Sequence, residues 1–410
     1  MRQTAAVIVG AGPAGLAMSR ELTGVGVDHV ILERGQVAQS WRTERWDSLR
    51  LLTPSRLSRL PGEPEPGPET AEFESAAEVV DRLVRHRGRW DAPVHEGVCV
   101  GSVRPTGSGF TVETDHGPWQ CRAVVVATGP GLPAIPRGAD LMPTRLEQLA
   151  ARDYRRPEQL PDGPVLVVGA SASGVQIAEE LNRAGREVSI AVGNHVRLIR
   201  QYRGRDIYDW FRVLGLLGDR FDEVDDLDRQ RRLPSAQLIG TPERRALDLG
   251  TLDRSGVVVL GRYVGVAGGR ARFAGSLANA VASADLKLAR LLDRIDQHVR
   301  EHVPGLEAGG PVARPTGIAL QPPPNEVDLR RFGSVVWATG HRPAYPFLDR
   351  QLLDRWGRLR HEGGVLPVPG LYALGLPFMR TRASGLLTGV GADARELAGH
   401  LAARIAGVAA

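Results

Sequence analysis

A turn rich in small residues stands near the middle of this 410-residue chain. The apolar run 165–168 enters Gly169-Ala170-Ser171-Ala172-Ser173-Gly174, and a pattern of helical period follows over 175–184. Small residues are required in such a strand-to-helix turn because the backbone bends sharply and a pyrophosphate must approach the free N–H groups of the helix N-terminus. The stretch therefore predicts a dinucleotide-binding turn.

A second copy of this pattern lies at the N-terminus. The strand-like run 5–9 enters Gly10-Ala11-Gly12-Pro13-Ala14-Gly15, whose glycines match G-x-G-x-x-G, and a helical pattern continues to Leu22. The next apolar run, 27–32, ends in Glu33, a carboxylate placed to accept hydrogen bonds from a ribose. An acid there disfavours a 2′-phosphate, so FAD or NAD fits this first turn. Two turns imply two dinucleotides side by side, with electron transfer between them.

The strand after the second turn, 188–192, ends differently. It leads into Gly193-Asn194-His195, where an acidic residue would be expected for NAD, and no acid is present. Four arginines follow, at Arg197, Arg200, Arg203 and Arg205. Arginine binds phosphate well, so these residues predict NADPH rather than NADH. The alternative is that they are solvated arginines in an arginine-rich protein.

Two buried strand patterns end in the same three residues. One run closes with Ala127-Thr128-Gly129, and another closes with Ala338-Thr339-Gly340. The echo indicates paired crossovers between two domains, with the proline-rich stretch 130–143 as the outward connection and 309–324 as the return. Between the first domain's strands, the block 40–54 holds two tryptophans amid charges. It is either a loop against a flat aromatic ligand or an ordinary packed connection.

Charge and cysteine content exclude several other classes. The net charge is +5, but Lys287 is the only lysine and the arginines form no stripe interleaved with aromatics, so nucleic acid is not an expected partner. Cys99 and Cys121 lie far apart, which excludes a C-x-x-C disulfide reductase and a zinc site, and we expect no bound metal. No apolar run approaches a membrane span, and the chain begins almost directly on a strand, so we expect a cytoplasmic protein with no membrane partner.

In motif order, almost the whole chain resembles the class B flavin-dependent monooxygenases, a group that contains the plant YUCCA enzymes, animal flavin-containing monooxygenases and Baeyer–Villiger enzymes. The block 40–61 is most similar to the YUCCA-type and actinobacterial branch. The resemblance implies an α/β fold of two Rossmann-like dinucleotide-binding domains, an FAD domain over 1–155 and 330–410 with an NADPH domain inserted over 161–325.

The resemblance also implies the site residues. FAD would bind through the first turn, Glu33 and the residues Ser40, Trp41, Arg45, Leu52, Val100, Gly375, Gly389 and Asp393. The other predicted cofactor-binding residues, not divided between the two cofactors, are Arg34, Ala127, Thr128, Gly129, Ala338, Thr339 and Gly340. NADPH would bind through Gly169 to Gly174 and Arg197, with Arg200 or Arg203 as further phosphate partners. Thr53 stands near the position of the asparagine that steadies the flavin hydroperoxide in flavin-containing monooxygenases, and is the candidate catalytic residue.

The activity implied is oxygenation of a small organic substrate by O₂ at nitrogen, sulfur or a carbonyl, through a C4a-(hydro)peroxyflavin. The chain departs from the class B pattern at 148–156, where F-x-G-x-x-x-H-x-x-x-W is expected and Ala150 occupies the histidine position. The alternatives are an NAD(P)H-dependent reductase or oxidase without productive oxygen transfer, and a non-catalytic flavin-binding sensor. The sequence leaves substrate and oligomeric state open.

Overall fold

The computed structural model describes residues 2–67, 72–303 and 313–407. Two five-stranded sheets organise it, with the strand orders β23-β8-β2-β3-β4 and β10-β21-β11-β12-β17, and every strand pair in both is parallel. Each sheet carries one of the two glycine turns. The expected α/β fold of two Rossmann-like domains is confirmed.

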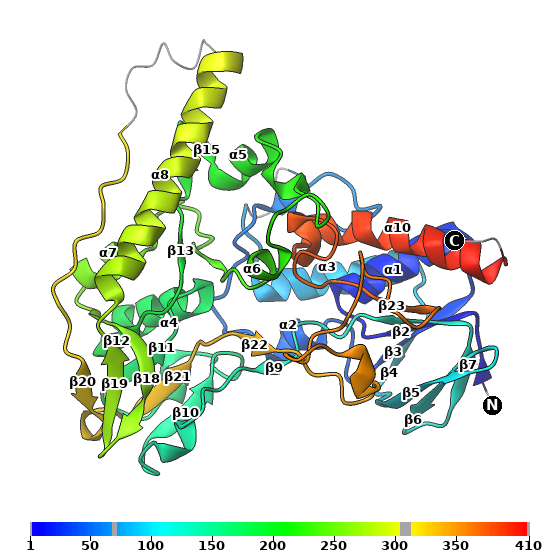
Figure 1. Cartoon of the computed structure of the whole chain (residues 1–410), viewed down its shortest axis with the longest axis horizontal. Coiled ribbons are helices and arrows are strands. Elements are labelled where there is room, and N and C mark those ends of the chain that lie inside the picture. The colour runs from blue at the N-terminus through cyan, green and yellow to red at the C-terminus, as the bar shows by residue number, and fades with distance from the viewer. Residues whose placement is uncertain (1, 68–71, 304–312, 408–410) are drawn as a thin grey trace.

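The first sheet is built around β2 (Ala6–Val9), which pairs with β3 (His29–Glu33) and β8 (Ala123–Val126). These strands are apolar and buried on both faces, as parallel strands between two layers must be. Figure 1 shows helices on one side of this sheet and a small sheet of order β1-β7-β6-β5 on the other. The further elements of this domain are α1 (Pro13–Gly24), α3 (Ala76–Arg89), β4 (Val94–Glu96), β23 (Leu371–Ala373), α10 (Leu387–Ile405), β1 (Arg2–Gln3), β5 (Val100–Thr106), β6 (Gly109–Thr114) and β7 (Trp119–Cys121).

The second sheet repeats the arrangement. Its centre is β11 (Val165–Val168), which leads through the second turn into α4 (Ala172–Arg183) and then to β12 (Val188–Ala191). A three-stranded antiparallel sheet of β18, β19 and β20 packs beside it, and the long helix α8 rises from its end (Figure 1). The elements are β10 (Glu147–Ala150), α7 (Leu249–Arg254), β17 (Val258–Leu260), β18 (Arg262–Ala267), β19 (Arg270–Ala274), α8 (Leu277–His302), β20 (Glu326–Asp328) and β21 (Ser334–Trp337).

The remaining short elements lie at the connections between the two domains and in their loops. They are α2 (Gln39–Thr43), η1 (Ser55–Leu57), β9 (Leu132–Pro133), η2 (Ala139–Leu141), η3 (Pro157–Gln159), β13 (Val196–Arg197), β14 (Gln201–Tyr202), β15 (Arg205–Asp206), α5 (Ile207–Val213), η4 (Leu216–Gly218), α6 (Leu227–Arg231), β16 (Ala236–Gln237), η5 (Leu329–Arg331), β22 (His341–Arg342), η6 (Arg350–Leu352) and η7 (Arg382–Gly385).

The domain boundaries at 155 and 330 need correction. Strands β10 and β21 fall inside the ranges expected for the first domain, yet both belong to the second sheet, where β21 pairs with β10 on one side and β11 on the other. The backbone of β21 is hydrogen-bonded to β11, and β10 is in turn hydrogen-bonded to β21, so both strands extend the second sheet. The crossovers lie instead at β9 and β22, which pair antiparallel through His341 and Pro133. The expected pairing of the two crossovers is confirmed.

The stretch 309–324 is not the return connection. Residues 309–312 lie outside the described residues, and the part from 313 onward runs along α8, where Arg314 pairs with Asp293 and the Ile318 N–H donates to Asp285. The chain then forms β20 and β21 before it crosses at β22. Prolines in this stretch fit an extended strap that needs few backbone hydrogen bonds.

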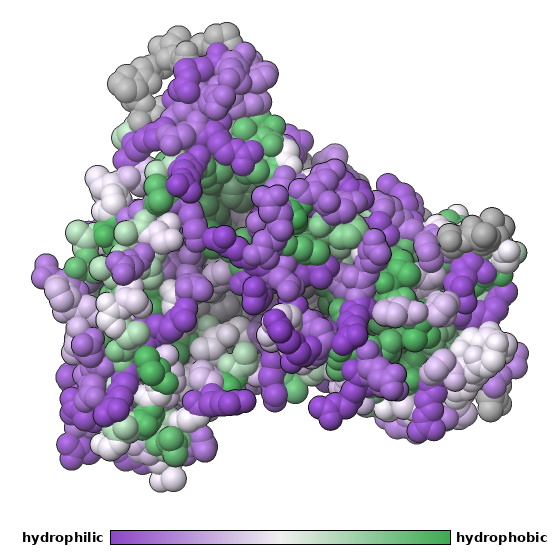
Figure 2. All heavy atoms as spheres, in the orientation of Figure 1, coloured by the Kyte–Doolittle hydropathy of each residue, from purple (hydrophilic) through white to green (hydrophobic). Residues whose placement is uncertain are grey.

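The face of the molecule in Figure 2 is mostly hydrophilic, with hydrophobic patches over α10 and between α8 and α5. Within the described ranges, no helix combines the length and the apolar character that crossing a membrane would require.

Candidate cofactor-binding site

The N-terminal turn has the steric features of a dinucleotide cradle. Gly10 has φ +107°, and a Cβ there would lie 2.6 Å from the carbonyl oxygen of Ala127. A Cβ on Gly15 would overlap the carbonyl oxygen of Gly10, so both positions exclude any side chain. At Gly12, the N-cap of α1, a Cβ would meet no described atom within 4 Å, and no side chain caps the helix. The first N–H groups of α1 therefore point into space that a pyrophosphate fits.

Glu33 completes this cradle. Its carboxylate is 8% exposed and accepts hydrogen bonds from the N–H of Ala11 at 2.7 Å and the N–H of Gly35 at 2.9 Å. The carboxylate is thereby fixed beside the turn, where a ribose would present its hydroxyls. The carbonyl of Glu33 also accepts from the N–H of Val98, which brings Val100 at the start of β5 to the same end of the site.

The C-terminal residues predicted for this site divide into two groups. Gly375 has φ +82°, and a Cβ there would lie 2.9 Å from the Cβ of Ala14, so the chain after β23 lies against the first turn of α1. Gly389 is different, because a side chain on it would overlap Ala383 in η7. Asp393 is 2% exposed, and burial raises its pKa to about 6 against a hydrogen bond from Ser384. These last two positions pack α10 onto η7, and their role at the flavin stays a prediction.

The second turn repeats the geometry of the first. Gly169 has φ +111°, a Cβ on it would overlap the carbonyl oxygen of Ala338, and a Cβ on Gly174 would overlap that of Gly169. Ser171 is the N-cap of α4 and its side chain makes no capping hydrogen bond. Among the described residues, this helix N-terminus also has no side-chain partner and fits a second pyrophosphate.

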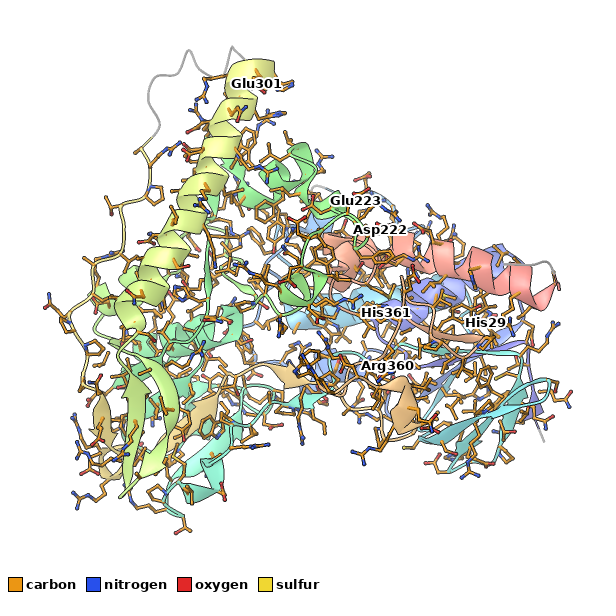
Figure 3. All side chains as sticks on the ribbon, viewed as in Figure 1. His29, Asp222, Glu223, Glu301, Arg360 and His361 are labelled. Atoms are coloured by element: carbon orange, nitrogen blue, oxygen red, sulfur yellow. The ribbon has the colours of Figure 1, made fainter. Side chains whose placement is uncertain are left out.

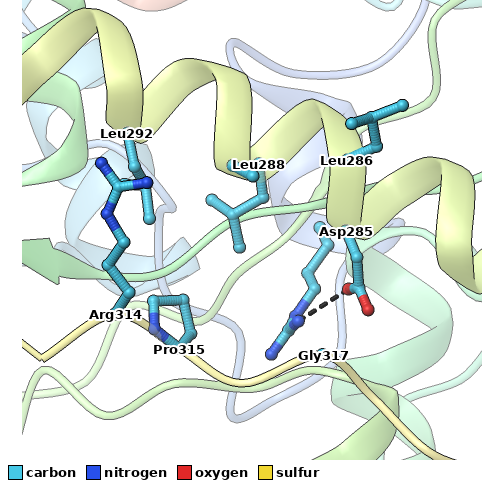
Figure 4. A pocket seen from close by; sticks show the side chains of 9 residues that line it. Asp285, Leu286, Leu288, Leu292, Arg314, Pro315 and Gly317 are labelled. Atoms are coloured by element: carbon cyan, nitrogen blue, oxygen red, sulfur yellow. Dashed lines mark hydrogen bonds and ion pairs between the residues drawn. The ribbon is translucent and has the colours of Figure 1, made fainter.

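The arginine predicted to bind the NADPH phosphate has another role. Arg197 is 7% exposed, and its guanidinium donates to Asp248 at 2.9 Å, to Asp285 at 2.6 Å and to the carbonyl of Thr316 at 3.1 Å. Figure 4 shows the ion pair of Asp285 beside a pocket of about 290 Å³ between α8 and the strap at Pro315. The assignment of Arg197 to the 2′-phosphate is therefore wrong, because two carboxylates already neutralise it.

The neighbouring arginines are also engaged. Arg200 is 1% exposed and pairs with Asp206 at 3.2 Å, and Arg203 pairs with Asp296 at 2.7 Å. Arg205 is exposed and stacks on Trp210, with its Cζ 5.4 Å from the ring centre. Arg200 and Arg203 therefore anchor the segment after β13 to the rest of its own domain. Arg200 additionally donates to the carbonyl of Leu52 at 2.9 Å.

The tryptophan block forms the seam between the domains. Trp41 packs against the cores of both domains, while Trp46 and Leu49 belong to the core of the second. The Cζ of Arg45 lies 4.9 Å from the centre of the Trp41 ring. Burial lowers the pKa of Arg45, and it also lowers the pKa of His341 on β22, which the charge of Arg45 lowers further. Trp46 is therefore part of an ordinary packed connection, which was the second interpretation of this block. The seam also carries positive charge, from Arg45.

Thr53, the candidate catalytic residue, is buried and its Oγ1 lies 2.5 Å from the Oγ of Ser58. The hydroxyl therefore has a local partner, and its catalytic role stays a prediction. Ser40 lies in α2, whose first N–H groups follow Ala38, and the N–H of Ala38 donates to the carbonyl of Ala11 in the first turn. Arg34 is exposed, with Glu44 as its partner at 3.8 Å.

The triplets Ala127-Thr128-Gly129 and Ala338-Thr339-Gly340 lie behind the two turns, at the start of the crossovers. Ala127 and Ala338 supply the carbonyl groups against the first glycine of each turn. Thr339 donates its hydroxyl to the carbonyl of Ala134 at 2.7 Å, and the carbonyl of Gly340 accepts from the N–H of the same residue. Thr128 and Gly129 are exposed at the corresponding place in the first domain.

One residue at the edge of the second site escaped the sequence analysis. Arg262 begins β18, two residues after β17 ends at Leu260, and its Nη2 donates to the Oδ1 of Asn194 at 2.8 Å. The available signal was the parallel order of the strands, which places the ends of β12 and β17 at one edge of the sheet. The four arginines nearer in sequence drew the prediction away from it.

Comparison with known proteins decides the family. A family profile described as pyridine nucleotide-disulphide oxidoreductase matches residues 7–204. A CzcO-like oxidoreductase of uncharacterised function from Geobacillus kaustophilus is 30% identical over 395 residues, which cover 95% of this chain and 96% of that protein. The chain belongs to the CzcO-like oxidoreductases.

This CzcO-like chain is also related to flavin monooxygenases. It is 32% identical to the indole-3-pyruvate monooxygenase YUCCA1 of Oryza sativa over 202 residues, which cover 47% of the chain and 49% of that enzyme. A flavin-containing monooxygenase from Stenotrophomonas maltophilia shares its fold, with a TM-score of 0.66 and 22% identity over 98% of this chain and 99% of the other. The predicted similarity to flavin-dependent monooxygenases is confirmed, and FAD and NADPH stay the predicted cofactors. The actinobacterial branch stays a prediction.

Proposed function

We propose that this CzcO-like protein is an FAD- and NADPH-dependent monooxygenase that transfers one atom of O₂ to a small organic substrate. One observation carries the proposal. Two dinucleotide cradles, each with an uncapped helix N-terminus, lie at the carboxyl ends of two parallel sheets that are joined by paired crossovers and by the Trp41 seam. FAD bound in the first cradle would supply the oxygen chemistry. This chain is similar in sequence to a monooxygenase over about half of its length.

The chain's own residues would bind, orient and shield. Gly12 and the first turn of α1 would take the flavin pyrophosphate, and Glu33 its adenosine ribose, while Ser171 and the first turn of α4 would take the pyrophosphate of NADPH. Trp41, packed against both cores, would keep water out of the seam between them. We propose only that the substrate is a small organic molecule, oxygenated at nitrogen, sulfur or a carbonyl. We also propose that the protein is cytoplasmic.

A reductase or oxidase without oxygen transfer is the second candidate, and one observation favours it. The segment 148–156 should carry the class B signature, but its first three residues belong to the edge strand β10, with Leu149 and Ala150 buried. The Thr53 hydroxyl is hydrogen-bonded to Ser58. Neither feature offers a side chain to steady an oxygenated flavin.

Rapid mixing separates these candidates. The protein, loaded with FAD and reduced by NADPH without oxygen, is mixed with O₂ while absorbance and hydrogen peroxide are measured. A transient absorbance distinct from oxidised and reduced flavin, with less than one peroxide per NADPH in the presence of a substrate panel, supports the monooxygenase. Immediate return of oxidised flavin with one peroxide per NADPH supports the oxidase. Failure of NADPH and NADH to bleach the flavin contradicts both and leaves the sensor.

A further inference from the structure

The end of β12 lacks the positive charge that a 2′-phosphate requires. In a dinucleotide fold, the adenosine ribose lies at the carboxyl end of the second strand, which here is β12 followed by Gly193 and Asn194. Arg197, Arg200 and Arg203 are each neutralised by a carboxylate elsewhere in the domain. Arg205, the fourth arginine after β12, is exposed and places its guanidinium over the Trp210 ring of α5. These arginines therefore leave the phosphate's cation to another element.

The start of β18, just after the neighbouring strand β17, supplies one. Strand β17 runs parallel to β12 with Ala191 opposite Leu260, and the N–H of Val192 donates to the carbonyl of Leu260, so both strands end at the same edge. Two residues after Leu260 stands Arg262, whose side chain reaches back to Asn194. A Cβ built on Gly193 would lie 3.6 Å from the Nε of Arg262, which places the guanidinium directly over the end of β12.

The guanidinium of Arg262 is oriented without being neutralised. Its Nη2 donates to the Oδ1 of Asn194 at 2.8 Å, and both residues are exposed. Over residues 2–67, 72–303 and 313–407, it has no carboxylate within ion-pair distance, unlike the three arginines above. An amide partner fixes the side chain while leaving the positive charge and its other N–H groups available to a phosphate.

We propose that Arg262, oriented by Asn194, binds the 2′-phosphate of NADPH and sets the preference of this protein for NADPH over NADH. The inference rests on the proposed function, because it takes the second turn to be the NADPH cradle. An acid in place of Asn194 would repel the phosphate and hold Arg262 in an ion pair. The neutral amide does neither, and it also tolerates the free 2′-hydroxyl of NADH, so the preference depends on Arg262 rather than on exclusion.

Direct binding of two fragments tests this without any turnover. Calorimetry on the FAD-loaded protein compares adenosine 2′,5′-bisphosphate, which carries the 2′-phosphate, with AMP, which lacks it. Arg262→Ala should weaken the bisphosphate at least tenfold and leave AMP within twofold, while Arg262→Lys retains part of the preference. Asn194→Asp should also lower the preference for the bisphosphate over AMP.

Arg205→Ala is the matched control, since it removes an exposed arginine that stacks on Trp210. In steady-state assays, Arg262→Ala should raise the KM for NADPH, with kcat and the KM for NADH unchanged.

Three outcomes would overturn the proposal. If Arg262→Ala weakened the binding of both fragments equally, Arg262 would support the adenosine or the fold and not the 2′-phosphate. If the preference for the bisphosphate over AMP did not change, Arg262 would not belong to the site. If the wild-type protein bound neither fragment, the assignment of the second turn would fail together with the inference. By contrast, the expected fragment preference together with release of all the oxygen as hydrogen peroxide would support the role of Arg262. That result would contradict the proposed monooxygenase activity.

Discussion

The backbone carbonyl of Ala338 occupies the space that a side chain on Gly169 would need. The same relationship holds in the first domain, where the carbonyl of Ala127 would lie 2.6 Å from a Cβ on Gly10. Each small-residue turn is thus held from behind by the strand that ends in an Ala-Thr-Gly triplet. The echo between the two triplets in the sequence follows from this contact, because both domains solve the same packing problem beside a sharp turn.

The two kinds of glycine in the first turn predict different failures. Gly12→Ala adds a methyl group to open space, so its apoprotein should have the melting temperature of the wild-type apoprotein. The variant should nevertheless retain little FAD, because the methyl group obstructs the pyrophosphate. Gly15→Ala drives a methyl group into the carbonyl of Gly10 and should destabilise the apoprotein by about 1–3 kcal/mol. Flavin absorbance per protein and thermal unfolding of the two variants check this. Full flavin content in Gly12→Ala would contradict the assignment of the first turn.

Arg197→Ala should act on stability. The substitution leaves Asp248 and Asp285 without their shared partner, and loss of one member of a buried ion pair costs about 3–5 kcal/mol. Urea unfolding should show the loss with no nucleotide present. In any folded fraction, the ratio of NADPH to NADH affinity should match that of the wild-type protein. A stable variant with a selectively lower NADPH affinity would restore the original assignment.

The sequence was sufficient to predict the fold because the determinants are local. Both turns, their strands and the helix α4 follow from runs of four to twelve residues with glycine at fixed positions, and Gly10, Gly15, Gly169 and Gly174 lie where no side chain fits. The domain boundaries could not be placed in this way. Whether a short strand such as β10 joins one sheet or the other depends on which edge is free, and that is decided by pairing with β21, far along the chain.

Residue roles outside the turns were harder to predict for a related reason. Arg197 and Arg262 are both arginines near the end of a predicted strand, and their sequence context is equally suggestive. Only the fold shows that Asp248 and Asp285 converge on the first, while the second faces the neutral Asn194. Similarly, the family resemblance places Asp393 at the flavin, and only the fold shows that it is buried with a hydrogen bond from Ser384 of η7.

Asp393 should make the protein less stable as pH rises from about 4 to 6. Burial raises its pKa to about 6 in the folded protein, whereas the unfolded chain releases the proton near its ordinary value of 3.8. In that window the folded state binds more protons, so its stability falls as pH increases. Asp393→Asn removes the titration and should gain roughly 1–3 kcal/mol above pH 6 relative to the wild-type protein. Urea unfolding at pH 4.5 and pH 7 measures the difference, and equal effects of the variant at both values would contradict it.

His361 should have the opposite effect in much the same window. It lies near the middle of the molecule in Figure 3, where burial, followed by the charges of Arg231 on α6 and of Arg358, lowers its pKa to about 4. Its neutral Nδ1 accepts the N–H of Gly364 at 3.2 Å. Between about pH 4 and 6.5 the unfolded chain binds a proton that the folded protein does not, so His361 destabilises the fold as pH falls.

The variant His361→Asn isolates this contribution. The amide oxygen of asparagine can still accept from the backbone of Gly364, but it does not titrate. The wild-type protein should lose roughly 1–3 kcal/mol more than His361→Asn when the pH drops from 7 to 4.5, as measured by urea unfolding. The double variant with Asp393→Asn tests additivity, because the two groups act through separate surroundings. Identical pH profiles for wild-type and His361→Asn would contradict a lowered pKa of the His361 imidazole in the folded protein.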